Sequence, residues 1–241
     1  MARAYIGTSG WNYDAWRDFY QDVPRAERLR YCGERFTGIE INATHYRLQA
    51  RATMKRWRDA VPAGFRFALK VHRFLTHNKK LKDVDESIPR SRDPARALDP
   101  KLEVVLWQMP ANFRKNAERL RSFARTLRRR WRAHRHAIEL RHSSWFDDQI
   151  AACLADYDLA VCLSDAPDFP LWDRVTTDLV YVRLHGHTRK YASSYSTPSL
   201  RRWADRARGW LDEGRDVHIY FDNDAEGAAP RNAVTLLELL S

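Results

Sequence analysis

Short runs in which apolar residues alternate with other residues recur along the whole chain. We predict eight β-strands from them: Tyr5–Thr8, Gly38–Ala43, Phe65–Val71, Glu103–Gln108, His136–Arg141, Leu159–Ser164, Leu179–His185 and Val217–Asp222. Most are separated by segments with apolar residues at helical spacing: Ala26–Phe36, Met54–Ala60, Asn116–Trp131, Asp147–Tyr157, Leu200–Asp212 and Asn232–Leu240. Alternating strands and helices predict parallel β-α-β units. Eight such units in 241 residues predict one TIM-type (β/α)8 barrel spanning residues 1–241, with a doubly wound open sheet as the alternative.

Two segments that punctuate this pattern bear on function. The turn after the first strand, Gly7-Thr-Ser-Gly-Trp11, is not the glycine pattern of dinucleotide-binding folds, and no phosphate-binding P-loop occurs in the sequence. The longest segment without a clear pattern is Arg73–Lys101, which follows the third strand and contains three prolines. We expect an irregular loop there and regard it as a candidate lid over the barrel.

Polar side chains share one face of most of the predicted strands. Successive side chains point to opposite faces, so Ile39 and Ile41 lie on one face and Glu40 on the other. In a barrel the apolar face packs under the helices and the second face lines the lumen. The polar residues on this second face are Glu40, Asn42, Lys70, Gln108, Glu139, Arg141, Arg183 and His185. They come near the C-terminal ends of the strands, where barrel enzymes have their active sites.

These residue types favour acid–base chemistry on an anionic substrate. We take Glu40, Glu139, Lys70 and His185 as candidate catalytic residues, since neighbouring carboxylates raise the pKa of one of the pair. Arginine binds phosphate or carboxylate through two parallel hydrogen bonds. The candidate substrate-binding residues are Asn42, Tyr46, His77, Gln108, Arg141, Trp145, Asp165, Arg183, Asn223 and Asn232. The alternative is a purely structural network of Glu40, Glu139 and Asp165 with Lys70, Arg141 and Arg183.

The turn Asp222-Asn-Asp224 lies before the last predicted helix, at a position where barrels often bind phosphate. Ordinary capping of that helix is the alternative. A divalent metal is not favoured, although its potential ligands include Glu40, Glu139, Asp165, His72 and His185. None of them shows the spacing of a known histidine metal motif, and the sequence leaves the cofactor open.

The formal net charge of +11 and the isoelectric point of about 9.8 favour an anionic partner, either a small molecule or a nucleic acid. Six arginines lie in Arg125–Arg135, but this run ends the helix after the fourth strand and should lie at the opposite end of the barrel. It is either a nucleic-acid patch or a solvated surface. The three cysteines show no paired spacing and are expected to be buried thiols. Without a signal region or an 18-residue apolar stretch, we expect a cytoplasmic protein without membrane contact. The sequence makes no prediction about oligomeric state.

Seven sequence blocks, spread nearly from end to end, carry a resemblance to a known family. They are Ile6–Tyr13, Glu40–Arg47, Phe67–Lys70 with Thr76 and His77, Gln108–Pro110, Glu139–Trp145, Tyr181–Gly186, and Tyr220–Asp224 with Gly227 and Asn232. In these blocks the sequence resembles the domain of unknown function 72 (YecE-like) family. The resemblance implies a TIM-type barrel but supplies no reaction. His45 stands where the family usually has Phe, and Asp222 where it usually has Asn.

Three functional hypotheses remain open at this point. The first is a hydrolase or lyase acting on a phosphorylated or nucleic-acid substrate at the C-terminal mouth of the barrel. The second is a metal-independent sugar isomerase or aldolase-like enzyme that uses Glu40, Glu139 and Lys70. The third is a barrel that binds nucleic acid through its outer arginines without catalysis.

Overall fold

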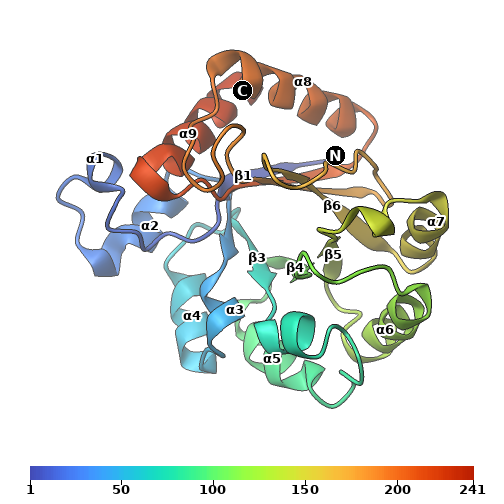
Figure 1. Ribbon diagram of the computed structural model, residues 1–241. Helices are drawn as coiled ribbons and strands as arrows, with labels where there is room; N and C mark the ends of the chain where they lie inside the picture. Colours follow the sequence, from blue (N-terminus) through green and yellow to red (C-terminus); the bar gives the residue numbers. More distant parts are fainter.

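Eight parallel strands follow one another around a barrel in the computed structural model, which describes residues 1–241 (Figure 1). The strands are β1 (Ala4–Thr8), β2 (Gly38–Ile41), β3 (Arg66–Lys70), β4 (Leu102–Gln108), β5 (Arg135–Glu139), β6 (Leu159–Asp165), β7 (Leu179–Leu184) and β8 (Asp216–Phe221). Each strand from β2 to β7 pairs in parallel with the strand that follows it in the sequence, and β8 pairs in parallel with β1. The prediction of a TIM-type (β/α)8 barrel is therefore confirmed.

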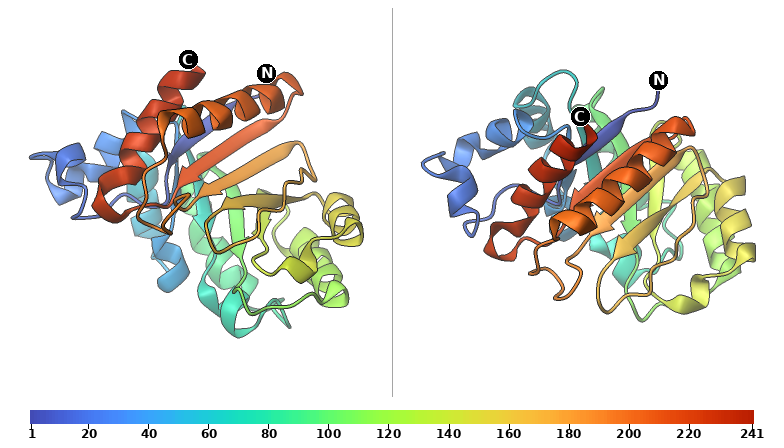
Figure 2. Two further views of the ribbon diagram at one scale, coloured as in Figure 1. Left: turned by 45° about the horizontal axis from the view of Figure 1, so that its top comes forward. Right: turned by 90° about the horizontal axis from the view of Figure 1, so that it is seen from above.

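Helices surround the strands on the outside of the barrel. They are α1 (Arg17–Tyr20), α2 (Arg28–Gly33), α3 (Ala43–Tyr46), α4 (Arg51–Asp59), α5 (Ile88–Ala95), α6 (Ala117–Arg130), α7 (Asp148–Asp156), α8 (Thr197–Asp212) and α9 (Ala228–Leu240). Side chains begin three of the long helices: Asn116, Asp147 and Ser196 each accept a hydrogen bond from a backbone N–H three residues later. Figure 2 shows α8 and α9 lying along the side of the barrel formed by β1 and β8. None of the helices is long and apolar enough to span a membrane.

The seam between β1 and β2 completes the ring. The Gly10 N–H donates to the Glu40 carbonyl at 2.8 Å, and the Thr37 N–H donates to the Ile6 carbonyl at 3.1 Å. Gly7 makes this close approach sterically feasible, because a Cβ atom there would lie 1.9 Å from the Gly38 carbonyl oxygen. The barrel can therefore close between β1 and β2 only if residue 7 has no side chain.

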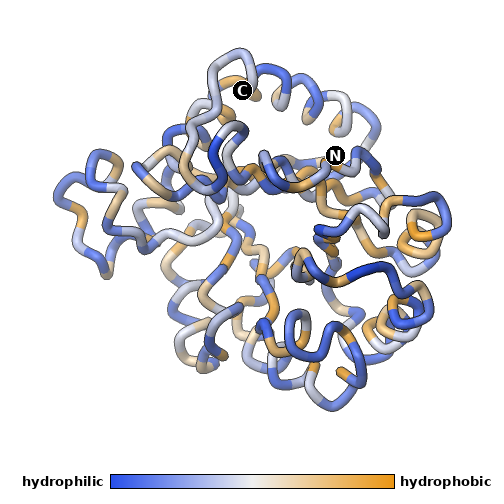
Figure 3. The backbone as a smooth tube through the Cα atoms, viewed as in Figure 1, coloured by the Kyte–Doolittle hydropathy of each residue, from blue (hydrophilic) through white to orange (hydrophobic).

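The apolar core consists of two clusters, one on each side of the barrel wall. The larger one packs the helices against the outward face of the strands, and its members include Ile39, Ile41 and Ile138. The smaller one fills the lumen and includes Ala68 and Tyr181. Figure 3 shows that the outer turns of the surrounding helices are largely hydrophilic. The alternation predicted from the sequence is confirmed, since the lumen cluster shares the strand face of Lys70, Glu139 and Arg183.

Two local predictions are wrong. Residues 73–101 are not an irregular loop: they contain a π-helical turn (Phe74–Asn78), α5 and a 3-10 turn (Arg96–Leu98). Pro89 occupies the first turn of α5, where a missing N–H costs no helical hydrogen bond. The second strand also ends at Ile41 rather than at residue 43, because the chain turns into α3.

Candidate active site

Arg183 of β7 lies at the centre of the lumen and binds three carboxylates. Its side chain is fully buried, and its Nε donates to Glu40 at 3.0 Å while Nη1 donates to Glu139 at 2.9 Å. Nη2 donates to Glu40 and to Asp222, each at 2.9 Å. Nη2 also donates to the Ser9 hydroxyl at 3.2 Å. All three nitrogens of the guanidinium group therefore donate to protein groups. The predicted contact between Arg183 and a substrate is therefore not supported, because its donors already face protein groups.

Glu40 and Glu139 are equally enclosed. Glu40 accepts hydrogen bonds from the Ser9 hydroxyl, from Arg183 and from the Tyr181 hydroxyl, the last at 2.7 Å. Burial alone would raise the pKa of Glu139, but the charges of Arg141 and Arg183 hold it well below its ordinary value. A carboxylate held in its ionised form by two guanidinium groups is a weak base. The structure thus places both glutamates as counter-ions beneath the mouth.

His185 and Asp222 complete this buried cluster. His185 Nδ1 lies 2.9 Å from Asp222 Oδ2, and its Nε2 lies 3.6 Å from Glu139 Oε1. The His185 side chain is fully buried, so the structure does not bring it to a surface that a substrate can touch. Burial would raise the pKa of Asp222, but the charge of Arg183 and the contact with His185 lower it below its ordinary value. Asp222 is therefore an ionised member of the network.

Lys70 is the cation that this network leaves without a partner. Its side chain ends β3 at the lumen face, with 5% of the residue exposed. The amine makes no hydrogen bond to the protein and lies more than 4.0 Å from every carboxylate oxygen. Burial and the charge of Arg183 lower the pKa of Lys70 to about 8, against the opposing effect of Asp222, Glu40 and Glu139. The Lys70 amine keeps some contact with solvent, since it is not among the enclosed polar atoms without a partner. A largely buried ammonium without a counter-ion is still costly, so this amine is suited to bind an anion or to lose its proton.

Arg141 and His77 lie close to Lys70 at the mouth, and only Arg141 adds a positive charge at neutral pH. Arg141 Nε donates to Glu139 at 2.6 Å, and its guanidinium carbon lies 4.4 Å from the centre of the Phe169 ring. The two terminal nitrogens of Arg141 have no hydrogen-bond partner in the protein. Partial burial, together with the charges of Lys70, Arg73 and Arg141, lowers the pKa of His77 to about 4. Lys70 of β3 and Arg141, two residues after β5, therefore place positive charge near the neutral ring of His77.

Asp224 is a carboxyl group of opposite character to Asp222. Burial and the neighbouring charge of Asp222 raise the pKa of Asp224 well above its ordinary value. Its Oδ1 is buried without a hydrogen-bond partner, and the Tyr13 hydroxyl lies beside it. Two carboxyl groups whose surroundings move their pKa values apart are the arrangement that acid–base enzymes use.

Four other predicted binding residues have different surroundings. Trp145 is 1% exposed, and its indole N–H donates to the Phe113 carbonyl at 2.7 Å. Asn223 and Asn232 are buried and hydrogen-bonded to each other at 3.0 Å, and Asn232 also accepts from the Tyr195 N–H. These three side chains hold loops in place, so direct contact with a substrate is not supported for them. Gln108 lies in the lumen, where its amide donates to the Met109 carbonyl at 2.6 Å.

The remaining predicted residues lie around the rim. Asp165 ends β6, partly exposed, with its Oδ1 3.5 Å from Nδ1 of His187. Asn42 and Tyr46 begin and end the short α3 and line a groove beside the mouth. His45, between them, turns its Nδ1 to the Val71 carbonyl at 2.9 Å and its ring edge to His77. His45, one of the two residues that depart from the family pattern, thus packs against His77 beside the mouth.

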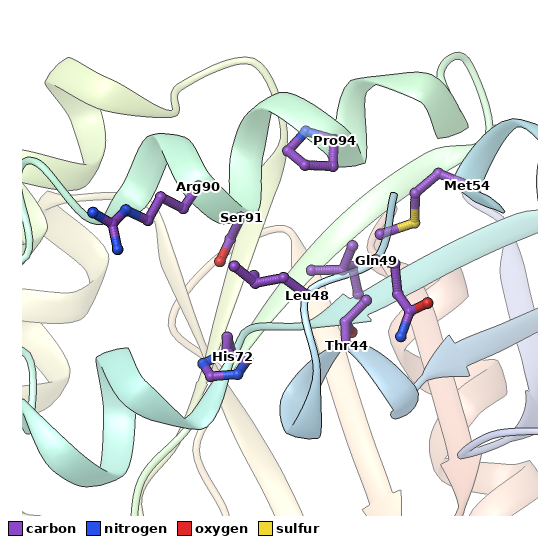
Figure 4. Close-up of a pocket in the computed structure, with 9 residues that line it drawn as sticks. Thr44, Leu48, Gln49, Met54, His72, Arg90, Ser91 and Pro94 are labelled. Carbon is purple, nitrogen blue, oxygen red and sulfur yellow. The ribbon is translucent and has the colours of Figure 1, made fainter. Parts of the chain in front are cut away.

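His72, named above as a potential metal ligand, does not reach the lumen, although continuing the alternation of β3 two residues beyond Lys70 would place it there. It lies in a small separate cavity between α5 and the segment from α3 to α4, together with Thr44, Leu48, Gln49 and Ser91 (Figure 4). The chain leaves the strand after Lys70, so the alternation of faces no longer applies at residue 72. No group of three His, Cys, Asp or Glu side chains has the geometry of a metal site.

The outer arginine run lies at the other end of the barrel, as predicted. Arg129 and Arg130 both form ion pairs with Asp85, and Arg135 pairs with Asp178 and Asp216. Arg128 is exposed and has no ion-pair partner. The three cysteines are buried free thiols, as expected from their spacing.

Asp224, Asp222, Tyr13 and Ser9 were not among the predicted catalytic or substrate-binding residues, although the turn Asp222–Asp224 was considered as a phosphate site. All four stand in sequence blocks that carry the family resemblance, and Asp222 follows the lumen parity of β8. Alternation along β8 could therefore have identified Asp222 as a lumen-facing residue. No local pattern distinguishes Asp224 from an ordinary capping residue, because its altered pKa depends on burial beside Asp222.

The chain matches, over residues 5–241, the family model described as a protein of unknown function, DUF72. The protein belongs to the DUF72 family. Among the relatives of this chain, the UPF0759 protein YunF of Bacillus subtilis is 24% identical over 98% of this chain and 94% of its own length. The UPF0759 protein YecE of Escherichia coli is 26% identical over 45% of this chain and 38% of its own length.

Solved structures show the same fold. A DUF72 family protein from Thermotoga maritima superposes with a TM-score of 0.85 at 23% identity, covering 99% of each chain. A DUF72 family protein from Enterococcus faecalis gives 0.85 at 20% identity, covering all of this chain and 95% of its own. A β-mannanase from Streptomyces thermolilacinus gives 0.53 at 10% identity, covering 91% of this chain and 78% of its own. These likenesses show the fold alone.

Proposed function

We propose that this DUF72 protein is an enzyme, a hydrolase or lyase, that acts on a phosphorylated substrate at the C-terminal mouth of the barrel. The observation that carries the proposal is the unpartnered amine of Lys70. Every other charged side chain in the central cluster has an oppositely charged partner, and Lys70 does not. The negative charge that would balance it is the substrate's.

The neighbours of Lys70 favour a phosphate group as that charge. The terminal N–H groups of Arg141 are free, and guanidinium N–H groups match the spacing of phosphate oxygens. The positive charges of both Lys70 and Arg141 lower the pKa of His77, so both lie near it. The overall surplus of positive charge would also attract an anion from solution.

Asp224 supplies the proton that such a reaction needs. Cleavage of a phosphoester breaks a P–O or C–O bond, and the departing oxygen must take up a proton. The raised pKa of Asp224 favours the protonated form of its carboxyl group, which suits a general acid. Ionised Asp222 maintains this state by its charge, and Arg183 holds Asp222 in position.

Substituting Lys70→Met should weaken the binding of inorganic phosphate at least about tenfold, because it removes the ammonium without adding volume. In the wild type the affinity should fall as the pH rises through about 8, where Lys70 loses its proton. Since a bound anion favours the ammonium form, binding at pH 8 should take up protons. Titration calorimetry in two buffers of different ionisation enthalpy measures both effects, with Lys55→Met on exposed α4 as the control. Wild-type affinity in Lys70→Met would refute the proposed anion site.

The same lysine supports a second candidate, an aldolase-like enzyme that forms a Schiff base with a sugar. A pKa of about 8 leaves part of the Lys70 amine neutral and nucleophilic near neutral pH. Borohydride reduction in the presence of sugar phosphates would attach the sugar covalently to Lys70 in that case, as peptide mass spectrometry would show. A phosphoester hydrolase without a Schiff base gives no adduct.

Asp224→Asn should reduce kcat on a cleaved phosphoester by about 10²–10⁴-fold with little change in KM, because the amide keeps the shape but donates no acidic proton. Wild-type activity should fall as the pH rises through the raised pKa of Asp224, and the variant should lose that dependence. The substrate panel contains phosphomonoesters, sugar phosphates, nucleotides and short oligonucleotides. The control is Glu226→Gln, an exposed carboxylate two residues later. If Asp224→Asn keeps the wild-type rate and pH profile, Asp224 is not the acid.

A further inference from the structure

A groove of about 540 Å³ runs beside the mouth, next to the ends of β1 and β2. Its walls come from residues 10–13 after β1, from α2, from the start of α3 and from α4. Neither Lys70 nor the Arg183 cluster lines it. The groove is therefore a second candidate binding surface, adjacent to the anion site.

Aromatic rings form much of the groove. Trp11 and Trp57 meet edge to face with their ring centres 5.1 Å apart, and Tyr13 and Tyr46 line the groove nearer to the mouth. Tyr46 is 65% exposed, which is unusual for so large a ring. Flat aromatic faces beside free space are the surfaces on which nucleobases stack.

One buried polar group in the groove has no partner. Asn42 Oδ1 is buried without a hydrogen bond, while the Asn42 amide lies beside the Tyr13 hydroxyl. With one N–H directed to Tyr13, the Asn42 amide still has its acceptor oxygen and one donor, a pair that complements the edge of a nucleobase. Ala26, Leu29, Ala43 and Ala60 complete the apolar wall. A sugar ring, with a hydroxyl on most of its carbons, would leave many polar atoms unpaired against that wall.

The groove is continuous with the proposed catalytic groups. Tyr13 lines it and lies beside Asp224, and Asn42 follows the buried Glu40 by two residues. Of the two arginines that line the groove, Arg56 has no carboxylate partner, whereas Arg25 is paired with Asp14. A molecule that lies in the groove can therefore contact both Tyr13, beside the catalytic groups, and an uncompensated cation.

We propose that this groove binds the base of a nucleotide whose phosphate lies at the mouth. The inference rests on the proposed function, since it names the substrate class of the same site. Trp57 and Trp11 supply the stacking surface, and Asn42 reads the polar edge of the base.

Binding of 5′-AMP and of ribose 5-phosphate, measured by titration calorimetry, tests the groove separately from the anion site. Trp57→Leu should weaken 5′-AMP binding about tenfold, which is about 1.4 kcal/mol, and leave ribose 5-phosphate unchanged. Asn42→Ala should act in the same direction. Trp172→Phe is the control, because Trp172 is also partly buried but stacks on Phe146 away from the groove. Circular dichroism and thermal melting establish that each variant is folded.

The outcomes distinguish failure of the groove from failure of the proposed function. Equal affinity of the wild type for 5′-AMP and ribose 5-phosphate, with no effect of Trp57→Leu, overturns the groove and leaves the anion site standing. Loss of 5′-AMP binding in Trp57→Leu but not in Lys70→Met supports the groove and overturns the proposed function. Loss of 5′-AMP binding in both variants, with ribose 5-phosphate sensitive to Lys70→Met alone, supports both. If wild-type protein binds neither ligand at millimolar concentration, both are overturned.

Discussion

Arg183→Met is expected to unfold the barrel at neutral pH. The substitution leaves three carboxylates, Glu40, Glu139 and Asp222, in the lumen without their shared cation. Removing one partner of a single buried ion pair costs about 3–5 kcal/mol, which is comparable with the whole stability of many domains. Urea unfolding followed by circular dichroism measures the loss. Arg128→Met is the matched control, because Arg128 is exposed and has no ion-pair partner.

The pH dependence of that variant should be inverted. In the wild type, Glu139 and Asp222 have lowered pKa values, so their stabilising effect is present above the ordinary carboxyl pKa and is lost as the pH falls. Without Arg183 burial dominates and raises these pKa values, so the variant should be more stable near pH 5 than near pH 8. A variant that remains as stable as the wild type at pH 8 would show that the carboxylates do not depend on Arg183.

Gly7→Ala is expected to prevent closure of the barrel between β1 and β2. The new methyl group would lie 1.9 Å from the Gly38 carbonyl oxygen and 3.3 Å from Phe36 Cβ. The obstacle is backbone, which cannot rotate away as a side chain does. We expect a loss of more than about 3 kcal/mol in unfolding free energy, at the upper end for overpacked sites.

Gly209→Ala is the control for that substitution. Gly209 lies on α8 with no atom within 4 Å of the added Cβ, and alanine has the higher helix propensity. The free energy of unfolding should rise by about 0.8–1 kcal/mol. Similar stability of Gly7→Ala and the wild type in the same urea titration would mean that the seam is looser than the structure shows.

Alternation along the strands was sufficient to predict much of the candidate site. Lys70, Glu139 and Arg183 share the lumen face because successive side chains in a strand point to opposite faces, and this local rule needs no tertiary information. The rule fails where the strand ends, as at His72, which lies outside the lumen. Beyond the strands the rule gives no information: Trp145 was predicted as a binding residue because it lies near the end of a strand, yet it is packed in the core.

The sequence by itself determined the barrel, the lumen face of each strand and the presence of balanced charges on that face. Only the tertiary structure decided which charges pair. Arg183 meets Glu40 across 143 positions of the chain, and ring closure brings them together at a distance that no sequence spacing encodes. Because Arg183 pairs with all three carboxylates, Lys70 has no ion-pair partner, and Asp224 lies beside the ionised Asp222. The chemistry of the mouth follows from that division, because burial and pairing, rather than residue type, set the protonation state of each group.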